Sequence, residues 1–362
     1  MASLYRKLRK LTRDPIAYCL DSRHGLLRAS GARMFAKQTL NYETLGAANA
    51  HRKITVVMTA YNTGHLVEAA IASVLAQSHQ NFELMVIDDA STDDTLDILK
   101  AMAARDGRVK VYHSPQNHGT YWSKNWCLSQ ATGEFVAFHD SDDRSAPMRL
   151  QMQLGAMLAG RGVDAVTCRW RRVDDEDNVL VIDGLPSRMA AISLMIRRDK
   201  ILGGTGYFDS VRISADTEFI GRIGRVFGKK NLRHMRQILY TGLLRDGSLT
   251  TSENSGFSWK ADGRSFEREL SGDRADYHDA FSVWHNENMN QLEQLTIAFP
   301  PTDRKFPAPE QICGGCDDNN ITAVLLVAGE HTLAPGASVE MPSNHSADQR
   351  PADVLASQAE AS

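Results

Sequence analysis

Four short apolar runs, separated by segments of helical periodicity, dominate residues 54–138. The first, Ile54–Met58, is continuous and rich in β-branched residues, which is typical of a strand buried on both faces of a parallel sheet. The other three runs cover residues 82–87, 109–112 and 135–138. Strands that alternate with helices at this spacing predict βαβ units. The pattern therefore predicts an α/β fold with a mainly parallel sheet flanked by helices.

The segments between these runs predict three helices. Apolar residues at helical spacing over residues 66–74 predict the first. Ser91–Asp94 is expected to open the second, which runs to about Arg105, because a hydroxyl can cap the helix and acids suit its positive first turn. The third is expected from about Tyr121 and is broken by Gly133.

Three of the four predicted strands end in polar or acidic clusters, which are Thr59–Asn62, Asp88–Asp89 and Asp140–Asp143. Ligands of open parallel sheets bind outside the carboxyl ends of the strands, so these clusters predict the site. Asp140 and Asp142 stand at i and i+2 in the last cluster. Two carboxylates so placed can hold a hard divalent cation and leave positions for phosphate oxygens. Alone, such a pair is a weak motif, since most adjacent acids lie in solvated turns.

Composition narrows the class of protein. The chain has 362 residues, 42% of them hydrophobic, and a net charge of −3, which excludes wholesale disorder and argues against a dedicated nucleic-acid binder. No apolar run is long enough to span a bilayer, and the start of the chain lacks a secretory apolar core. Five scattered cysteines favour a reducing compartment. We expect a cytoplasmic enzyme.

Charge divides the chain into three expected parts. Residues 1–53 hold eleven Lys or Arg against three Asp or Glu, whereas residues 301–362 hold three against nine and carry six prolines, directly after Pro300. We expect a basic extension at 1–52, a catalytic domain at 53–300 with halves 53–160 and 161–300, and a largely disordered acidic tail at 301–362. Within the tail, Ile321–Ala328 could form a lone strand, and Cys313 and Cys316 are expected to be reduced thiols.

The basic extension begins with an amphipathic pattern. Leu4, Leu8 and Leu11 share one helical face, with Lys and Arg on the others, before Asp14-Pro15 ends the helix. Residues 1–20 could bind an anionic surface, which would place the protein on the inner face of the cytoplasmic membrane. They could equally pack on the main domain.

The order of the motifs resembles the nucleotide-binding half of family 2 glycosyltransferases, which have the GT-A fold. The likeness is strong over residues 53–157 and continues through Gly206–Asp209, Ala215–Glu218 and Arg245–Thr250. It implies an inverting transfer of a sugar from a nucleotide-sugar, with UDP favoured, to a glycan or lipid-linked acceptor, assisted by Mn²⁺ or Mg²⁺. Residues 4–22 also resemble the leader of bacterial capsule and lipopolysaccharide enzymes, which implies synthesis of a surface polysaccharide.

The resemblance also implies roles for individual residues. Asp216 matches the general base, with Glu218 as the rival carboxylate, and Asp89 would accept from the uracil N–H. Gly247 stands where many relatives have a histidine, so the third metal ligand is open, with His278 and His285 as substitutes. The residues implied in nucleotide binding are Thr59, Ala60, Tyr61, Asp88, Asp89, Lys124, Asp140 and Arg245, and those implied in metal binding are Asp140 and Asp142, with Asp143 behind them.

Two other functions remain open from the residues alone. A sugar-nucleotide nucleotidyltransferase would share the α/β core, but it needs a basic, Gly-rich loop after the first strand, and Thr59–Gly64 has no Lys or Arg. A catalytically silent binding module would keep the fold and lose turnover. The acids Asp140, Asp142 and Asp216 argue against that second alternative.

Overall fold

The computed structural model describes residues 11, 14–22, 24–245, 248–251, 256–316 and 318–329. The chain divides into two units, residues 1–41 with 331–362, and residues 42–330. The described part of the first unit holds helix α2 (Pro15–Leu20) and most of α3 (Gly25–Ala48). Most of the leucine-striped segment expected at residues 1–20 lies outside the described residues. Among the described residues, no helix is long and apolar enough to cross a bilayer.

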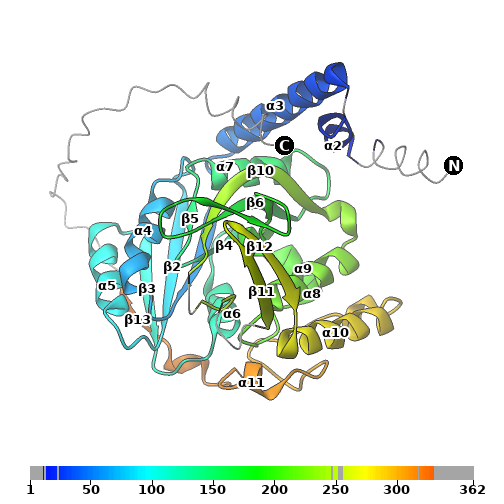
Figure 1. Cartoon of the computed structure of the whole chain (residues 1–362). Helices are drawn as coiled ribbons and strands as arrows, with labels where there is room; N and C mark the ends of the chain where they lie inside the picture. Colours follow the sequence, from blue (N-terminus) through cyan, green and yellow to red (C-terminus); the bar gives the residue numbers. More distant parts are fainter. Residues whose placement is uncertain are drawn as a thin grey trace. The chain divides into compact units, whose positions relative to one another are not determined.

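The second unit is built on the predicted parallel sheet (Figure 1). Its four parallel strands run in the order β4-β1-β2-β3. All of β1 and β2 is buried, as expected for strands covered on both faces. The strands are β1 (Ile54–Ala60), β2 (Phe82–Asp89), β3 (Val109–Ser114) and β4 (Phe135–Asp140). The predicted α/β class is confirmed.

Strands from the second half of the unit extend this sheet beside β4. There β9 pairs antiparallel with both β4 and β6, and β10 runs parallel to β6. A two-stranded ribbon, β11 with β12, continues the sheet through β7 (Figure 1). These strands are β5 (Arg144–Ser145), β6 (Ala165–Val173), β7 (Val179–Ile182), β8 (Arg188–Met189), β9 (Met195–Arg197), β10 (Leu232–Leu243), β11 (Phe257–Asp262) and β12 (Ser265–Leu270).

Helices flank the sheet much as the periodicity predicts. One start differs, because α5 begins at Thr95 rather than at Ser91. The Ser91 hydroxyl accepts the backbone N–H of Asn62 instead of capping the helix, so Ser91–Asp94 forms a loop between strand and helix. The helices are α4 (Gly64–Leu75), α5 (Thr95–Arg105), α6 (Thr120–Gln130), α7 (Arg149–Leu158), α8 (Arg198–Thr205), α9 (Ala215–Val226), α10 (Gly272–Glu287) and α11 (Glu310–Cys313).

The compact unit begins before the expected boundary at residue 53. Tyr42 is buried, and the last turns of α3 pack closely on α7. A Cβ on Gly46 would lie 2.0 Å from the carbonyl oxygen of Gln151, so only glycine permits this approach. Close packing at a single glycine leaves no pattern in the sequence or its composition. The expected domain boundary at residue 53 therefore lies later than the start of the compact unit.

The unit also ends later than expected, and the start of the predicted tail needs correction. Residues 301–316 and 318–329 are folded on the domain, and β13 (Leu325–Ala328) pairs antiparallel with β3. The strand suggested by Ile321–Ala328 therefore has a partner, the edge of the parallel sheet. Cys316 is buried, so the thiol pair lies in a packed segment rather than a flexible one. Residues 330–362 lie outside the described residues.

A buried carboxylate ties the amino ends of the strands together. Glu83 on β2 accepts hydrogen bonds from Thr55 on β1 (2.7 Å) and from Thr132 before β4 (2.6 Å). Lys53 and Lys110 each approach its second oxygen at 3.1 Å. Burial alone would raise the pKa of Glu83, but the hydrogen bonds from Thr132, Thr55 and Lys53 outweigh it and lower the pKa from 4.5 to about 2.

Replacing this carboxylate should destabilise the sheet in a pH-dependent way. At pH 7 Glu83→Gln should lower the free energy of unfolding by about 2 kcal/mol, since several charge-assisted hydrogen bonds are lost. A depressed native pKa contributes stability above the unfolded pKa, and that contribution is lost as pH falls from 4.5 through about 2. Urea denaturation at pH 7 and pH 3 measures the difference in the free energy of unfolding between wild type and Glu83→Gln. Glu68→Gln, at an exposed position, is the control. An equal difference at both pH values would contradict the pH-dependent stabilisation by Glu83.

Candidate active site

The parallel register brings the predicted polar clusters to one edge of the sheet. Thr59 on β1 stands opposite Asp140 on β4, and Ala60 stands opposite Asp88 on β2. The loops that follow β1, β2 and β4 therefore begin side by side. Tyr61, the next residue after β1, is about half exposed at this edge.

Hydrogen bonds join these loops to one another. The Thr59 hydroxyl lies 2.7 Å from the hydroxyl of Thr120, which begins α6. The Thr63 hydroxyl donates to Ser141 (3.1 Å), which joins the loop after β1 to the loop after β4. These bonds connect the end of β1 to the start of α6, and the loop after β1 to the loop after β4.

The two acids at the end of β2 have different surroundings. Asp89 is buried and accepts the backbone N–H groups of His118 (2.9 Å) and Gly119 (2.8 Å). Asp88 is also buried; its Oδ2 faces His113 (2.8 Å), and its Oδ1 has no hydrogen-bond partner in the structure. A buried oxygen without a partner is costly, so the Oδ1 atom of Asp88 is suited to receive a donor from a ligand.

The pair Asp140 and Asp142 follows β4, and each acid is met by a cation. Lys124 on α6, itself only 3% exposed, lies 3.1 Å from Asp140, and Arg245 lies 3.2 Å from Asp142. Burial and the nearby charge of Asp140 raise the pKa of Asp142, although Arg245 and Arg172 oppose the shift. Two crowded carboxylates of this kind provide the hard oxygen ligands that Mg²⁺ or Mn²⁺ prefers.

The third acid of this cluster supports the fold. Asp143 is buried and accepts the backbone N–H of Leu243 at the end of β10 (2.9 Å). Burial and the charges of Asp142 and Asp140 raise its pKa well above the usual range. His139, just before the pair, is also buried, and burial lowers its pKa to about 3, so it is neutral near pH 7. Asp143 thus points to the backbone rather than to a ligand.

Asp216, in the first turn of α9, is connected to this edge through Tyr121, a residue that no motif had singled out. Tyr121 is buried, and its hydroxyl accepts the backbone N–H of Asp216. Burial raises the pKa of Tyr121 well above its ordinary value, and the nearby charges of Asp216 and Asp140 raise it further. The side chain of Asp216 is half-buried.

A buried arginine also lies against this group and was missed. Arg274 on α10 donates to the Ser214 hydroxyl (2.6 Å) and to the carbonyl of Leu249 (3.0 Å). Burial lowers the pKa of its guanidinium, and the proximity of Tyr121 and Asp216 partly offsets that effect. Ser214 holds a left-handed conformation (φ +67°) directly before α9. Contacts between residues this distant in sequence could be found only in the structure.

Glu218, the rival carboxylate, lies in the core. It is fully buried, pairs with Arg222 on the next turn (2.7 Å) and faces His285 on α10 (2.9 Å). Burial alone would raise the pKa of Glu218, but Arg222 and His285 outweigh it and lower the pKa. Glu218 is thus a structural ion-pair residue.

Neither histidine considered as a third metal ligand lies with the acid pair. His285 belongs to the Glu218 cluster, and His278 is beside Asp279 (3.7 Å). Within the described ranges, no group of three or more His, Cys, Asp or Glu is arranged to hold a metal. A cation on Asp140 and Asp142 would therefore need further ligands from the substrate diphosphate or from water. Asp246 and Gly247, beside Arg245, lie outside the described residues.

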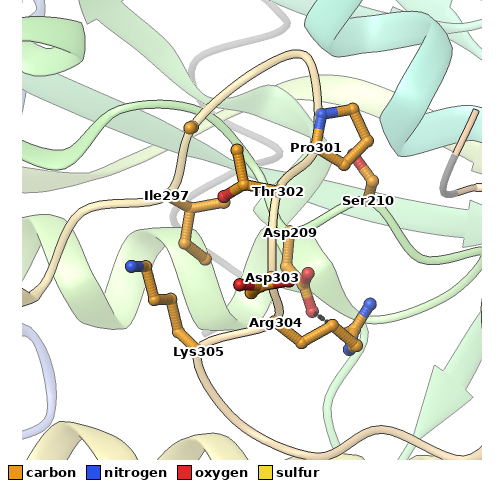
Figure 2. Close-up of a pocket in the computed structure, with 9 residues that line it drawn as sticks. Asp209, Ser210, Ile297, Pro301, Thr302, Asp303, Arg304 and Lys305 are labelled. Carbon is orange, nitrogen blue, oxygen red and sulfur yellow. Dashed lines mark hydrogen bonds and ion pairs between the residues drawn. The ribbon is translucent and has the colours of Figure 1, made fainter. Parts of the chain in front are cut away.

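A small pocket opens beside Asp209, on the loop before α9 (Figure 2). Its volume is about 20 Å³, room for roughly one water molecule. Asp209 is fixed there by Arg304 (2.6 Å) and by the hydroxyl of Tyr277 (3.0 Å). No residue expected in nucleotide or metal binding lines this pocket.

Comparison with known proteins agrees with this geometry. The family model described as "Glycosyl transferase family 2" matches residues 55–215. EpsE of Bacillus subtilis is 43% identical over 119 residues, covering 33% of this chain and 43% of that protein. The Escherichia coli protein named UDP-Glc:alpha-D-GlcNAc-diphosphoundecaprenol beta-1,3-glucosyltransferase WfgD is 38% identical over 105 residues, covering 29% and 41%.

Among solved structures, S. aureus TarS 1–349 in complex with UDP aligns with a TM-score of 0.44 and 24% identity, over 53% of this chain and 60% of that one. The chain spans less than half the length of the two curated relatives above. The matched region contains nearly all of β1, the strands β2 to β4 and the acid pair, and it ends at Ala215, one residue before Asp216. Residues 55–215 are thus similar to glycosyltransferase family 2, and the unit that contains them has a mainly parallel sheet between helices.

Proposed function

We propose that the protein transfers a sugar from a nucleotide-sugar, a UDP-sugar, to a glycan acceptor, with inversion at the anomeric carbon and with Mn²⁺ or Mg²⁺ as cofactor. One observation carries this proposal. Asp216 and Asp140, the first acid of the pair, both lie near the same buried tyrosine, Tyr121, and they come from the two halves of the domain. A proton acceptor and a set of cation ligands thus share one edge of the sheet.

The residues have distinct roles in the reaction. The carboxylate of Asp216 takes the proton of an acceptor hydroxyl as its oxygen bonds to the anomeric carbon. The bond from that carbon to the diphosphate oxygen breaks, and its electron pair leaves with the nucleoside diphosphate. Attack and departure on opposite faces invert the configuration, and no protein nucleophile is needed. Lys124 and Arg245 bring positive charge to the acid pair, where the diphosphate would lie.

The metal would be held by Asp140 and Asp142. Its chemistry is to neutralise the negative charge that develops on the departing diphosphate. The pair suits this use, because each side chain keeps part of its surface exposed, 38% for Asp140 and 20% for Asp142.

The base of the donor would lie by the end of β2, against Thr59, Ala60, Tyr61, Asp88 and Asp89. The unpartnered Oδ1 of Asp88 supports a ligand that offers an N–H or O–H there. The name of WfgD specifies UDP-Glc and a diphosphoundecaprenol-linked acceptor for that protein. By analogy we propose a UDP-sugar donor, a lipid-linked glycan acceptor and a place in bacterial surface polysaccharide synthesis.

Removing the general base should abolish transfer and spare donor binding. Asp216→Asn should lower kcat by 10²- to 10⁴-fold, the usual cost of losing a base, with little change in the affinity for UDP. Steady-state kinetics and calorimetric titration with UDP and Mn²⁺ measure the two quantities. The exposed Asp276→Asn on α10 is a matched control. Retention of most of kcat in Asp216→Asn would refute the assignment.

Glu218→Gln separates the catalytic carboxylate from the structural one. Breaking a buried ion pair leaves Arg222 without its carboxylate, so the free energy of unfolding should fall by about 3 kcal/mol. The folded fraction should keep its turnover. A stable but inactive Glu218→Gln protein would instead make Glu218 the base.

Metal removal tests the role of the acid pair. Excess EDTA should abolish turnover, and added Mn²⁺ should restore it, because the charge of the leaving group would otherwise be uncompensated. Asp142→Asn should lose at least about a hundredfold in kcat while unfolding at a similar temperature. Asp97→Asn, exposed on α5, is its control. Full activity in excess EDTA would refute the proposal that turnover requires a divalent cation.

We also propose that the basic residues 1–20 bring the enzyme to an anionic membrane surface. Attraction between surface charges is screened by salt, so co-sedimentation with anionic vesicles should fall as ionic strength rises. Removal of residues 1–20 should reduce it at low salt. Equal sedimentation with and without these residues would exclude this role.

A further inference from the structure

The turn Asn117–Gly119, which is bound to Asp89 of the proposed nucleotide site, is held from two sides. From the sheet, Asp89 accepts the backbone N–H groups of His118 and Gly119. Gly119 has φ +85°, and a Cβ there would meet Cγ of Arg212 at 3.0 Å and Sγ of Cys316 at 3.3 Å. The turn is therefore packed directly against a segment about 200 residues further along the chain.

That segment comprises residues 310–316 and 318–328, and its contacts reach backbone carbonyl groups of the turn, directly or through Arg212. Arg212 links the two, because its guanidinium donates to the carbonyl of Gly314 (2.9 Å) and to the carbonyl of Asn117 (3.0 Å). The thiol of Cys316, which is fully buried, lies 2.9 Å from the carbonyl oxygen of His118.

Asp318 makes the most direct link. Its carboxylate lies 2.9 Å from Nε2 of His118, whose Nδ1 lies 2.9 Å from the Ser114 hydroxyl at the end of β3. The imidazole is 1% exposed and stacks on Trp122 at 4.0 Å between ring centroids. The indole N–H of Trp122 in turn donates to the carbonyl of Asp318 (2.8 Å). The side chain of Asp318 thus holds the imidazole of His118 in the turn, and its backbone carbonyl holds the indole of Trp122 next to it.

The rest of the segment is anchored beyond Asp318. The indole N–H of Trp126 on α6 donates to the carbonyl of Ile321 (2.8 Å), and β13 pairs with β3. Two tryptophans of α6 are therefore bound to the same distant segment. Since Lys124, the partner of Asp140, is on the same helix, the segment also bears on the placement of that cation.

We propose that residues 310–316 and 318–328, which lie outside the region matched by the family model, form a strap that positions the turn beside the proposed nucleotide site, with Asp318 as a positioning residue acting through His118. The inference rests on the proposed function for its ligand, a nucleoside diphosphate. The strap touches neither reacting atoms nor cofactor. Its effect is to hold the Asn117–Gly119 amides on Asp89, and so to keep the pocket at the end of β2 in its binding shape.

The test compares Asp318→Ala with Asp318→Asn in the full chain. Asp318→Ala should weaken UDP binding, measured by calorimetry with Mn²⁺, about tenfold, which is the scale of one charge-assisted hydrogen bond. The donor KM should rise with it, and kcat should stay within about twofold. Asp318→Asn keeps an oxygen that can accept from His118 and should recover most of the affinity. Glu310→Ala, exposed in the same segment, is the matched control.

Amide hydrogen exchange judges the positioning independently of nucleotide binding. In Asp318→Ala the amides of His118 and Gly119 should exchange faster, while those of β1 keep their wild-type rates. Unchanged exchange at the turn, or UDP affinity equal to that of wild type, would overturn the inference. Suppose that the wild-type protein binds no nucleoside diphosphate, but Asp318→Ala still speeds amide exchange at the turn. The proposed function is then wrong, and the positioning of the turn by the strap is supported.

Discussion

Parallel pairing of β1 with β2 on one side and with β4 on the other sets the geometry on which the site depends. In this register Thr59 stands opposite Asp140, and Ala60 stands opposite Asp88. A shift by one residue would turn every side chain of a strand to the other face of the sheet. The register is specified because these strands are buried on both faces, and Glu83 fastens it at the opposite ends. The fold thus fixes the loops from which the acids project.

Concentrating acids at one edge of a sheet has an electrostatic cost, and the molecule offsets it with cations drawn from elsewhere in the chain. Lys124 comes from α6, Arg245 from the loop after β10, and Arg274 from α10. Even with these cations, burial and the charge of Asp140 raise the pKa of Asp142. Raised pKa values of this kind are frequent at functional sites, where a ligand can supply further charge. A cation shared by Asp140 and Asp142 would do so here.

The sequence predicted the parts of the molecule that local patterns determine. Four strands, their order along the chain and the polar ends of three of them follow from periodicity and β-branched composition, and β1 to β4 appear where expected. The predicted start of α5 at Ser91 was wrong, because the Ser91 hydroxyl accepts a hydrogen bond from the loop after β1 instead of capping the helix. The limits of the domain were also misjudged. Tyr42 and Cys316 are buried by partners distant in sequence, and composition carries no information about such partners.

The candidate site shows the same division. Asp140, Asp142 and Asp216 could be selected from motif order, and the structure brings them to one edge, yet their roles stay predictions. Glu218, two residues from Asp216, could be separated from it only by seeing Arg222 and His285 around it. Tyr121 and Arg274 carry no motif at all, since their importance arises from tertiary contacts.

The central claim is that this edge of the sheet performs an inverting transfer from a nucleotide-sugar. The most direct measurement incubates the purified full chain with Mn²⁺ or Mg²⁺ and a panel of UDP-, GDP- and dTDP-sugars, with a lipid-linked glycan acceptor. Nucleoside diphosphate release is followed, and the anomeric configuration of the product is read by NMR. The account predicts metal-dependent release from a UDP-sugar and a product of opposite configuration to the donor. Release of pyrophosphate from a nucleoside triphosphate instead, or a product that retains the donor configuration, would contradict it.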